Sequence, residues 1–102
     1  NIISPRSPAA IKRIPSTGDL LLIYNDHSGR FPYKSDQQLA PLVSAISKDD
    51  GKTWGNYKVL EKDPAGWFDY PSITFTGNRM ILTYRKMGSG LKVVTLPIGW
   101  FY

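Results

Sequence analysis

Two arginines, Arg6 and Arg85, are the residues of this sequence best suited to bind an anion. A guanidinium group presents its N–H donors in a planar fork that matches the two oxygens of a carboxylate. Arg6 follows an apolar pair near the start of the chain, and Arg85 directly follows an apolar segment that ends in Tyr84. Part of a carboxylate clamp is the functional interpretation of each, and an ordinary surface arginine is the competing one.

Carboxylates and metal ligands are scattered along the chain. Glu61 and Asp69 flank a segment that contains proline and glycine, while Asp26 and Asp36 lie in a polar stretch where carboxylates are mostly solvated. His27 is the single histidine, and there is no cysteine. The ligand clusters of zinc sites are therefore missing. We expect no metal site and no cofactor.

The composition of the 102 residues is that of a small globular domain with a basic surface. Hydrophobic residues make up 41% and the formal net charge is +5, which would suit an anionic partner. The basic residues form no run or stripe, so nucleic acid is not the expected partner. The longest apolar run, Leu20–Tyr24, is too short to span a bilayer, and no membrane partner is expected. With no cysteine, the sequence does not indicate a cellular compartment.

The octet Ser47–Trp54 gives the clearest information about the secondary structure that must position the candidate site residues. It reads Ser-Lys-Asp-Asp-Gly-Lys-Thr-Trp. Asp49 and, more weakly, Ser47 can accept hydrogen bonds from backbone N–H groups within their own turn. Gly51 supplies a backbone conformation that residues with a Cβ avoid, and Trp54 brings a large apolar surface that needs a neighbour. The octet predicts a tight connection between two strands.

Short apolar segments separated by turn residues predict a chain built from strands. Leu20–Tyr24 is a continuous apolar run between turn signals, which is typical of a strand buried on both faces. The polar stretch 25–40 is longer than an ordinary connection in a small domain, which indicates either a functional loop or disorder. The expected strands are 8–14, 20–24, 41–46, 57–61, 70–75, 79–84 and 91–96.

The octet resembles the Asp-box, the repeated structural turn of sialidase-type (neuraminidase, BNR) β-propellers. Three further phrases are similar to bacterial sialidase-like proteins. They are 4–15, which begins Ser-Pro-Arg-Ser-Pro, 17–21, which reads Thr-Gly-Asp-Leu-Leu, and 70–73, which reads Tyr-Pro-Ser-Ile. The phrases run in order and, with the octet, span most of the chain. The resemblance is to the last two blades of a six-bladed propeller.

Two halves of the chain also match each other, in residues 8–24 and 71–84. Each half has a proline, an apolar strand, a Thr-Gly turn and an apolar strand that ends in tyrosine. The offset of about 60 residues exceeds the ~40–50-residue period of propeller blades, and the long stretch 25–40 accounts for the excess. The repeat favours two blades of four strands each.

We therefore expect an all-β unit of two four-stranded antiparallel blades, about 1–61 and about 62–102. The second blade has three clear strands, and its fourth would be Ile98–Tyr102 or Ile2–Ile3. Two blades cannot close a ring, so sheet edges and apolar faces would need a partner. That partner is either the remaining blades of a longer propeller or identical subunits in a homotrimer. The sequence leaves both open.

The order of the strands along the chain predicts at which end of the sheets each connection lies. Because successive strands alternate in direction, the Thr-Gly turns and the octet are expected at one end. The other end, where propellers commonly place their sites, is expected to hold 1–7, 25–40, 61–70 and 85–90.

The resemblance implies roles for residues at that second end. Sialidases use a tyrosine nucleophile at a strand start comparable to that of Tyr70; a neutral tyrosine does not repel the substrate carboxylate, and a nearby glutamate can take its proton. Family enzymes hold that carboxylate with three arginines, and Arg6 and Arg85 are the candidates here. Trp67 and Phe68 could stack on a sugar ring or simply fill the rim. An aromatic residue at a strand edge is the competing interpretation of Tyr70.

The function implied by the resemblance is that of a sialidase-like glycoside hydrolase acting on sialosides or related glycans, or of the C-terminal part of one. The aspartate general acid and the first arginine of the family come from early blades, so one copy of this chain is not expected to assemble a complete site. A threefold ring would present three copies of Tyr70 and Arg6, which resembles a lectin more than an enzyme. The alternative is a noncatalytic carbohydrate-binding propeller that assembles as a homo-oligomer.

Overall fold

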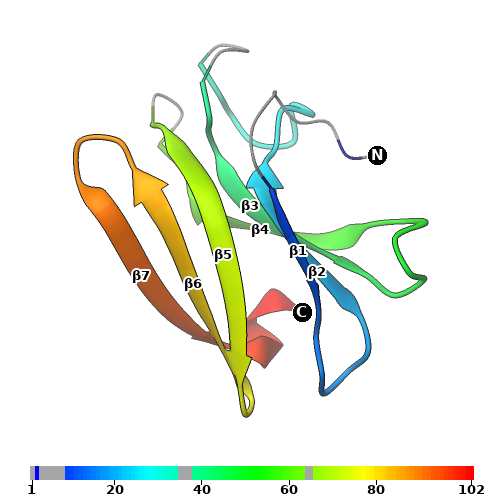
Figure 1. The fold of residues 1–102 in the computed structure, drawn as a ribbon. Coiled ribbons are helices and arrows are strands. Elements are labelled where there is room, and N and C mark those ends of the chain that lie inside the picture. The colour runs from blue at the N-terminus through cyan, green and yellow to red at the C-terminus, as the bar shows by residue number, and fades with distance from the viewer. Residues whose placement is uncertain (1, 3–8, 35–37, 64–65) are drawn as a thin grey trace.

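The chain is described from a computed structural model, which covers residues 2, 9–34, 38–63 and 66–102. The predicted site residue Arg6 and the loop residue Asp36 lie outside the described residues. Within them, seven strands and one short 3-10 helix form (Figure 1), so the prediction of an all-β chain is confirmed. The elements are β1 (Ala10–Arg13), β2 (Leu20–Asn25), β3 (Leu42–Ser47), β4 (Gly55–Glu61), β5 (Phe68–Thr76), β6 (Arg79–Lys86), β7 (Gly90–Pro97) and η1 (Ile98–Phe101).

The strands form two antiparallel sheets. Sheet 1 has the order β1-β2-β3-β4, and sheet 2 has the order β5-β6-β7. Each strand pairs with its neighbour in sequence, which antiparallel pairing allows with short turns. Strands β1 and β5 are in contact and lie at the centre of Figure 1, where the two sheets meet. Neither sheet closes on itself within the part of the chain that the structure describes.

One apolar core joins the two sheets. Strands β2 and β3 are buried along almost their whole length, as predicted for Leu20–Tyr24. Their side chains alternate between two layers because successive residues of a strand point to opposite faces. The inner layer packs sheet 1 against sheet 2 and η1, and includes Leu21, Ile23, Ile46, Ile73, Leu82 and Phe101. The outer layer covers the other face of sheet 1, with Leu22, Tyr24, Val43, Ala45, Phe31 and Trp54.

The C-terminal residues form η1 rather than a strand, so the prediction of a fourth strand at Ile98–Tyr102 is wrong. Pro97 has no backbone N–H to continue a ladder. Ile98 and Phe101 are three residues apart and therefore lie on the same side of a 3-10 helix, where both are buried in the inner layer. Of the other predicted candidate, Ile3 lies outside the described residues. Sheet 2 has three strands among the residues that are described.

Antiparallel pairing places the connections at two ends, as strand order predicts. The octet end also carries η1, because the backbone N–H of Ile98 bonds to the carbonyl of Asn78. At the loop end, the backbone N–H of Phe68 bonds to the carbonyl of Leu39 and ties the two sheets together. The octet end holds the turns 14–19, 48–54 and 77–78. The loop end holds the described parts of the other connections, which are 26–34, 38–41, 62–63, 66–67 and 87–89.

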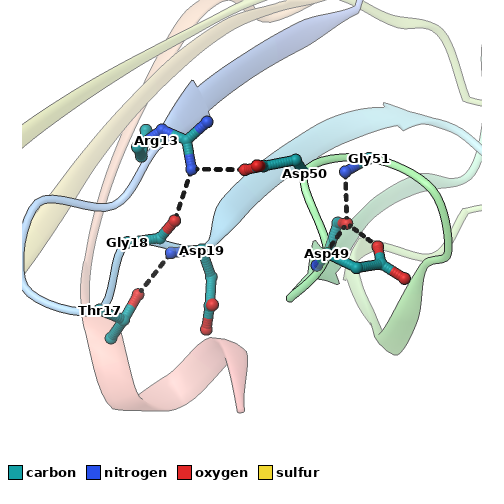
Figure 2. Close-up of polar contacts among 8 residues, drawn as sticks. Arg13, Thr17, Gly18, Asp19, Asp49, Asp50 and Gly51 are labelled. Atoms are coloured by element: carbon teal, nitrogen blue, oxygen red, sulfur yellow. Dashed lines mark hydrogen bonds and ion pairs between the residues drawn. The ribbon is translucent and has the colours of Figure 1, made fainter.

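The octet forms the tight turn that its sequence predicts, between β3 and β4. The carboxylate of Asp49 accepts hydrogen bonds from the Thr53 backbone N–H at 2.8 Å, from the Thr53 hydroxyl at 2.5 Å and from the Ser47 hydroxyl at 2.8 Å. The Ser47 hydroxyl oxygen in turn accepts the N–H of Gly51, whose φ of 92° lies in the region that favours glycine (Figure 2). Local hydrogen bonds therefore close the turn.

The octet turn is joined to the neighbouring turn of sheet 1. Figure 2 shows the guanidinium of Arg13 between the two, donating to the carbonyl of Gly18 at 2.7 Å and to the carboxylate of Asp50 at 2.9 Å. Tyr102, which follows η1, is joined to the turn 14–19, because its hydroxyl lies 2.7 Å from the carboxylate of Asp19. The octet end is therefore held by contacts between residues far apart in sequence.

The hydrogen bonds to Asp49 predict a pH-dependent contribution to stability. Hydrogen bonds from the Thr53 hydroxyl, the Thr53 backbone and Ser47 lower the pKa of Asp49 from 3.8 to about 2. Because the folded pKa lies below the ordinary value, this contribution is present above 3.8 and is lost as the pH falls through about 2. Asp49→Asn should lower the urea midpoint at pH 7, and the difference from wild type should shrink between these two pH values.

Asp50→Asn is the matched control for that comparison. Its carboxylate makes a solvent-exposed ion pair with Arg13, which contributes little to stability. Asparagine also tolerates the φ of 59° at this position. Urea unfolding of the three proteins at pH 7 and pH 2 measures both effects. An Asp49→Asn deficit that is the same at both pH values would contradict the predicted role of the carboxylate.

Candidate functional site

Four side chains, one of them the buried carboxylate of Asp69, lie together at the loop end of sheet 2. Asp69 and Arg85 are paired residues of β5 and β6, and Asp69 is 3% exposed. Arg85 donates from Nε to Oδ1 at 2.8 Å and from Nη2 to Oδ2 at 2.5 Å, while Trp67 donates from Nε1 to Oδ2 at 3.1 Å. The guanidinium also lies beside the ring of Tyr70, at 5.2 Å from its centroid. We call Trp67, Asp69, Tyr70 and Arg85 the Asp69 cluster.

Tyr70 reaches the surface through an irregularity of β5. The pairing of β5 with β6 shifts register between Asp69 and Ser72, and Tyr70 has a φ of 52°. A β-bulge of this kind re-aims a side chain and bends the strand. Tyrosine is rare at positive φ, so the surrounding pairing must hold it in a conformation that costs about 1–3 kcal/mol. The ring is 62% exposed as a result.

The charge of Arg85 is largely balanced within the cluster. The hydrogen bonds that Arg85 donates to Asp69 are the main reason that the pKa of Arg85 lies above its ordinary value, so the guanidinium is always charged. Asp69 occupies Nε and Nη2 in a bidentate pair. Among the described residues, Nη1 has no hydrogen-bond acceptor, and the side chain is 49% exposed. Arg85 can therefore offer an incoming anion one edge of its guanidinium, although its bidentate fork is already engaged.

The structure separates the predicted site residues into two groups. Trp67, Tyr70 and Arg85 come together in the Asp69 cluster. Phe68 does not join them, because it is fully buried in the core and packs edge-on against Tyr84, with ring centroids 6.3 Å apart. Phe68 therefore fills space, which was one of the two interpretations of its sequence position.

Glu61, one of the two carboxylates that flank the segment before Tyr70, accepts a hydrogen bond from Tyr84. The hydroxyl of Tyr84 donates a short hydrogen bond to Glu61 Oε2, and the ammonium of Lys86 lies 4.0 Å from Oε1. Tyr84 is 2% exposed, and burial followed by the bond to Glu61 raises the pKa of its phenol. This tyrosine–glutamate pair joins sheet 1 to sheet 2. Sequence reasoning missed it, because the two residues lie on different sheets and no local pattern connects them.

The side chains of Asp26 and His27 make their contacts within the connection that follows β2. Asp26 is fully buried, and its carboxylate accepts hydrogen bonds from the Ser28 N–H at 2.9 Å and from Arg30 at 3.0 Å. His27 stacks on Tyr33 at 4.2 Å and bonds through Nε2 to a backbone carbonyl. No group of three or more potential ligand side chains is placed to bind a metal ion in the described part of the chain. No helix among these residues is long and apolar enough to cross a membrane.

No protein-family model, curated protein or solved structure matches this chain.

The Asp69–Arg85 pair predicts a coupling that unfolding experiments can measure. Arg85→Met should lower the free energy of unfolding by about 2 kcal/mol, since it leaves a buried carboxylate without its charged partner. This is less than the ~3–5 kcal/mol of fully buried pairs, because the Arg85 side chain is 49% exposed. The double variant Arg85→Met/Asp69→Asn should recover about 1 kcal/mol of the loss, because the uncompensated charge is gone. Strictly additive losses in urea unfolding would show that the pair is not coupled.

Proposed function

We propose that this chain forms part of a sialidase-like glycoside hydrolase, in which the two sheets are blades of a six-bladed propeller and the Asp69 cluster is one wall of the substrate site. One observation carries the proposal. Trp67 and Arg85, both selected from the sequence as site residues, bond to one buried carboxylate at the loop end, and Tyr70, the predicted nucleophile, lies beside Arg85. Trp67 and Tyr70 are close to Asp69 in sequence, whereas Arg85 comes from β6 and is brought to them by the pairing of β5 with β6.

The proposed chemistry assigns one role to each exposed side chain of the cluster. Tyr70 is the nucleophile: its phenol oxygen bonds to the anomeric carbon as the glycosidic oxygen departs with a proton from a general acid. A base takes the phenol proton, and the nearby cation of Arg85 favours the negative charge that develops on the oxygen. The Nη1 edge of Arg85 binds the sugar carboxylate. The indole of Trp67 packs on the sugar ring.

The base and the general acid come from a partner in this proposal. Asp69 and Glu61, which flank the segment before Tyr70, are both engaged in hydrogen bonds of their own. Sheet 2 also has features that suit a partner. Leu91 and Val93 of its edge strand β7 are 71% and 62% exposed, and the outer edge of β7 has no strand beside it among the described residues. The partner is either the remaining propeller blades or identical subunits in a homotrimer.

Turnover of an aryl sialoside tests the catalytic proposal. Tyr70→Phe should lower kcat about 100-fold or more, because the nucleophilic oxygen is lost. Arg85→Met should mainly raise KM. Release of a fluorogenic phenol measures both, using the protein assembled with its partner. Tyr102→Phe, at the octet end, is the matched control and should retain wild-type turnover. Wild-type turnover by Tyr70→Phe would eliminate Tyr70 as the nucleophile.

Carbohydrate binding without catalysis is the second candidate function. The engagement of Asp69 and Glu61 favours it, because neither carboxylate is left to serve Tyr70 as a base. In that case Tyr70→Phe and Arg85→Met should each weaken binding of a methyl sialoside about tenfold, with no product formed. Any release of sialic acid that depends on Tyr70 would contradict this alternative.

The mass in solution separates the two proposed partners. A homotrimer predicts that the 102-residue chain sediments as three copies at micromolar concentration. Val93→Lys should then yield a folded monomer, because it places a charge within an apolar contact. Lys92→Gln, one residue away on β7, is the control that should leave the mass unchanged. A monomer at every concentration tested would contradict the homotrimer and leave the longer propeller as the proposal.

A further inference from the structure

The octet turn forms a pocket at the end of the molecule opposite the Asp69 cluster. The pocket has a volume of about 210 Å³ and shares no lining residue with the cluster. It is smaller than the ~300–1,000 Å³ of sites for drug-sized molecules, so it suits a single ring. Its lining residues are Ile46, Lys48, Thr53, Trp54, Gly55 and Asn56.

The pocket arises from the way in which β3 and β4 leave the turn. Their pairing shifts register between Ser44 and Ile46, where Ile46 faces Gly55. Asn56 follows with a φ of 52°, a conformation that asparagine tolerates better than most residues. The strand pair therefore bends directly after Trp54, whose ring packs against the outer layer of sheet 1. A glycine at the bend leaves space, because a Cβ added at Gly55 would meet no atom within 4 Å.

Lys48 supplies the pocket with a positive charge. Its side chain is exposed, and among the described residues it has no ion-pair partner. The acidic neighbours are engaged elsewhere: Asp49 with Ser47 and Thr53, and Asp50 with Arg13. The ammonium lies 5.7 Å from the centroid of the Tyr102 ring, and such a cation–π contact with a neutral ring leaves the positive charge in place. The charge of Lys48 is therefore available to an incoming anion.

The remaining walls offer hydrogen-bond acceptors beside an aromatic ring. Asn56 donates from Nδ2 to the carbonyl of Tyr102 at 3.3 Å, which leaves its Oδ1 without a donor among the described residues. The hydroxyl of Thr53 donates to Asp49, and its oxygen can still accept. Trp54 contributes an aromatic surface. A matching ligand has a ring with an apolar face, several hydroxyl donors and a negative charge.

We propose that the octet pocket binds an acidic monosaccharide, a pyranose that carries one carboxylate. Lys48 binds the carboxylate, Thr53 and Asn56 accept hydrogen bonds from ring hydroxyls, and Trp54 packs on the apolar face of the ring. The site is additional to the proposed hydrolase site, because it lies at the other end of the strands and depends on none of the same residues.

Glucuronate and glucose are suitable probes, because they differ only in the carboxylate that Lys48 is proposed to bind. The experiment is an NMR titration of the complete 15N-labelled chain at constant ionic strength. Glucuronate should produce saturable shifts in the indole N–H of Trp54 and the backbone N–H groups of Gly55 and Asn56. Glucose should bind about tenfold more weakly, since it lacks a charge-assisted hydrogen bond. The indole N–H of Trp67 reports on the Asp69 cluster separately, so failure at one site does not decide the other.

Two variants locate the site. Gly55→Val should weaken glucuronate binding at least tenfold by filling the pocket, and a β-branched residue suits this strand position. Lys48→Gln should weaken it about tenfold, with Lys92→Gln on β7 as the unaffected control. Should Gly55→Val lose the dispersed spectrum of a folded chain, Lys48→Gln decides alone. Unchanged affinity in Lys48→Gln, equal affinity for glucose, or no saturable shift at the octet would overturn the proposal.

Discussion

The packing of sheet 1 against sheet 2 is the contact on which the rest of the structure depends. Neither sheet alone could bury the apolar side chains of β2, β3 and β6, because each would leave one face in water. Joining them in one inner layer also fixes the two ends of the molecule. At the loop end it brings Tyr84 against Glu61, and at the octet end it seats η1 beside sheet 1. Both candidate sites therefore lie where connections project beyond a rigid support.

Much of this architecture could be predicted from the sequence. The seven strands, the two ends and the octet turn follow from short apolar runs and turn residues, whose physical signals are local. The prediction of a C-terminal strand was wrong, and the reason is physical. Apolar residues at Ile98 and Phe101 are compatible with a strand or with a 3-10 helix. The shape of the core selects the helix, because it accepts two side chains three residues apart on one side.

Three residues of the Asp69 cluster were selected from the sequence, whereas Asp69 was not, and the contacts between them could not be predicted. Trp67, Tyr70 and Arg85 could be placed at one end from strand order alone. The partner of Arg85 could not, because the register shift between Asp69 and Ser72 decides which side chains of β5 face inward. That shift places a carboxylate under the guanidinium and sends the tyrosine outward. The register of β5 and β6 therefore determines how much of the Arg85 guanidinium is free to bind a ligand. Amino-acid composition alone gives no information on this register.

The positive φ of Tyr70 has a consequence for how this position responds to selection. Glycine and asparagine occupy such a conformation at lower cost than an aromatic residue. In a library screened only for a folded chain, these two residues should therefore displace tyrosine at this position. Under selection for ligand binding, tyrosine should persist despite its backbone cost. The two selections would therefore favour different residues at position 70. At a buried core residue such as Leu82, both would favour the same side chain, because ligand binding also requires a folded chain.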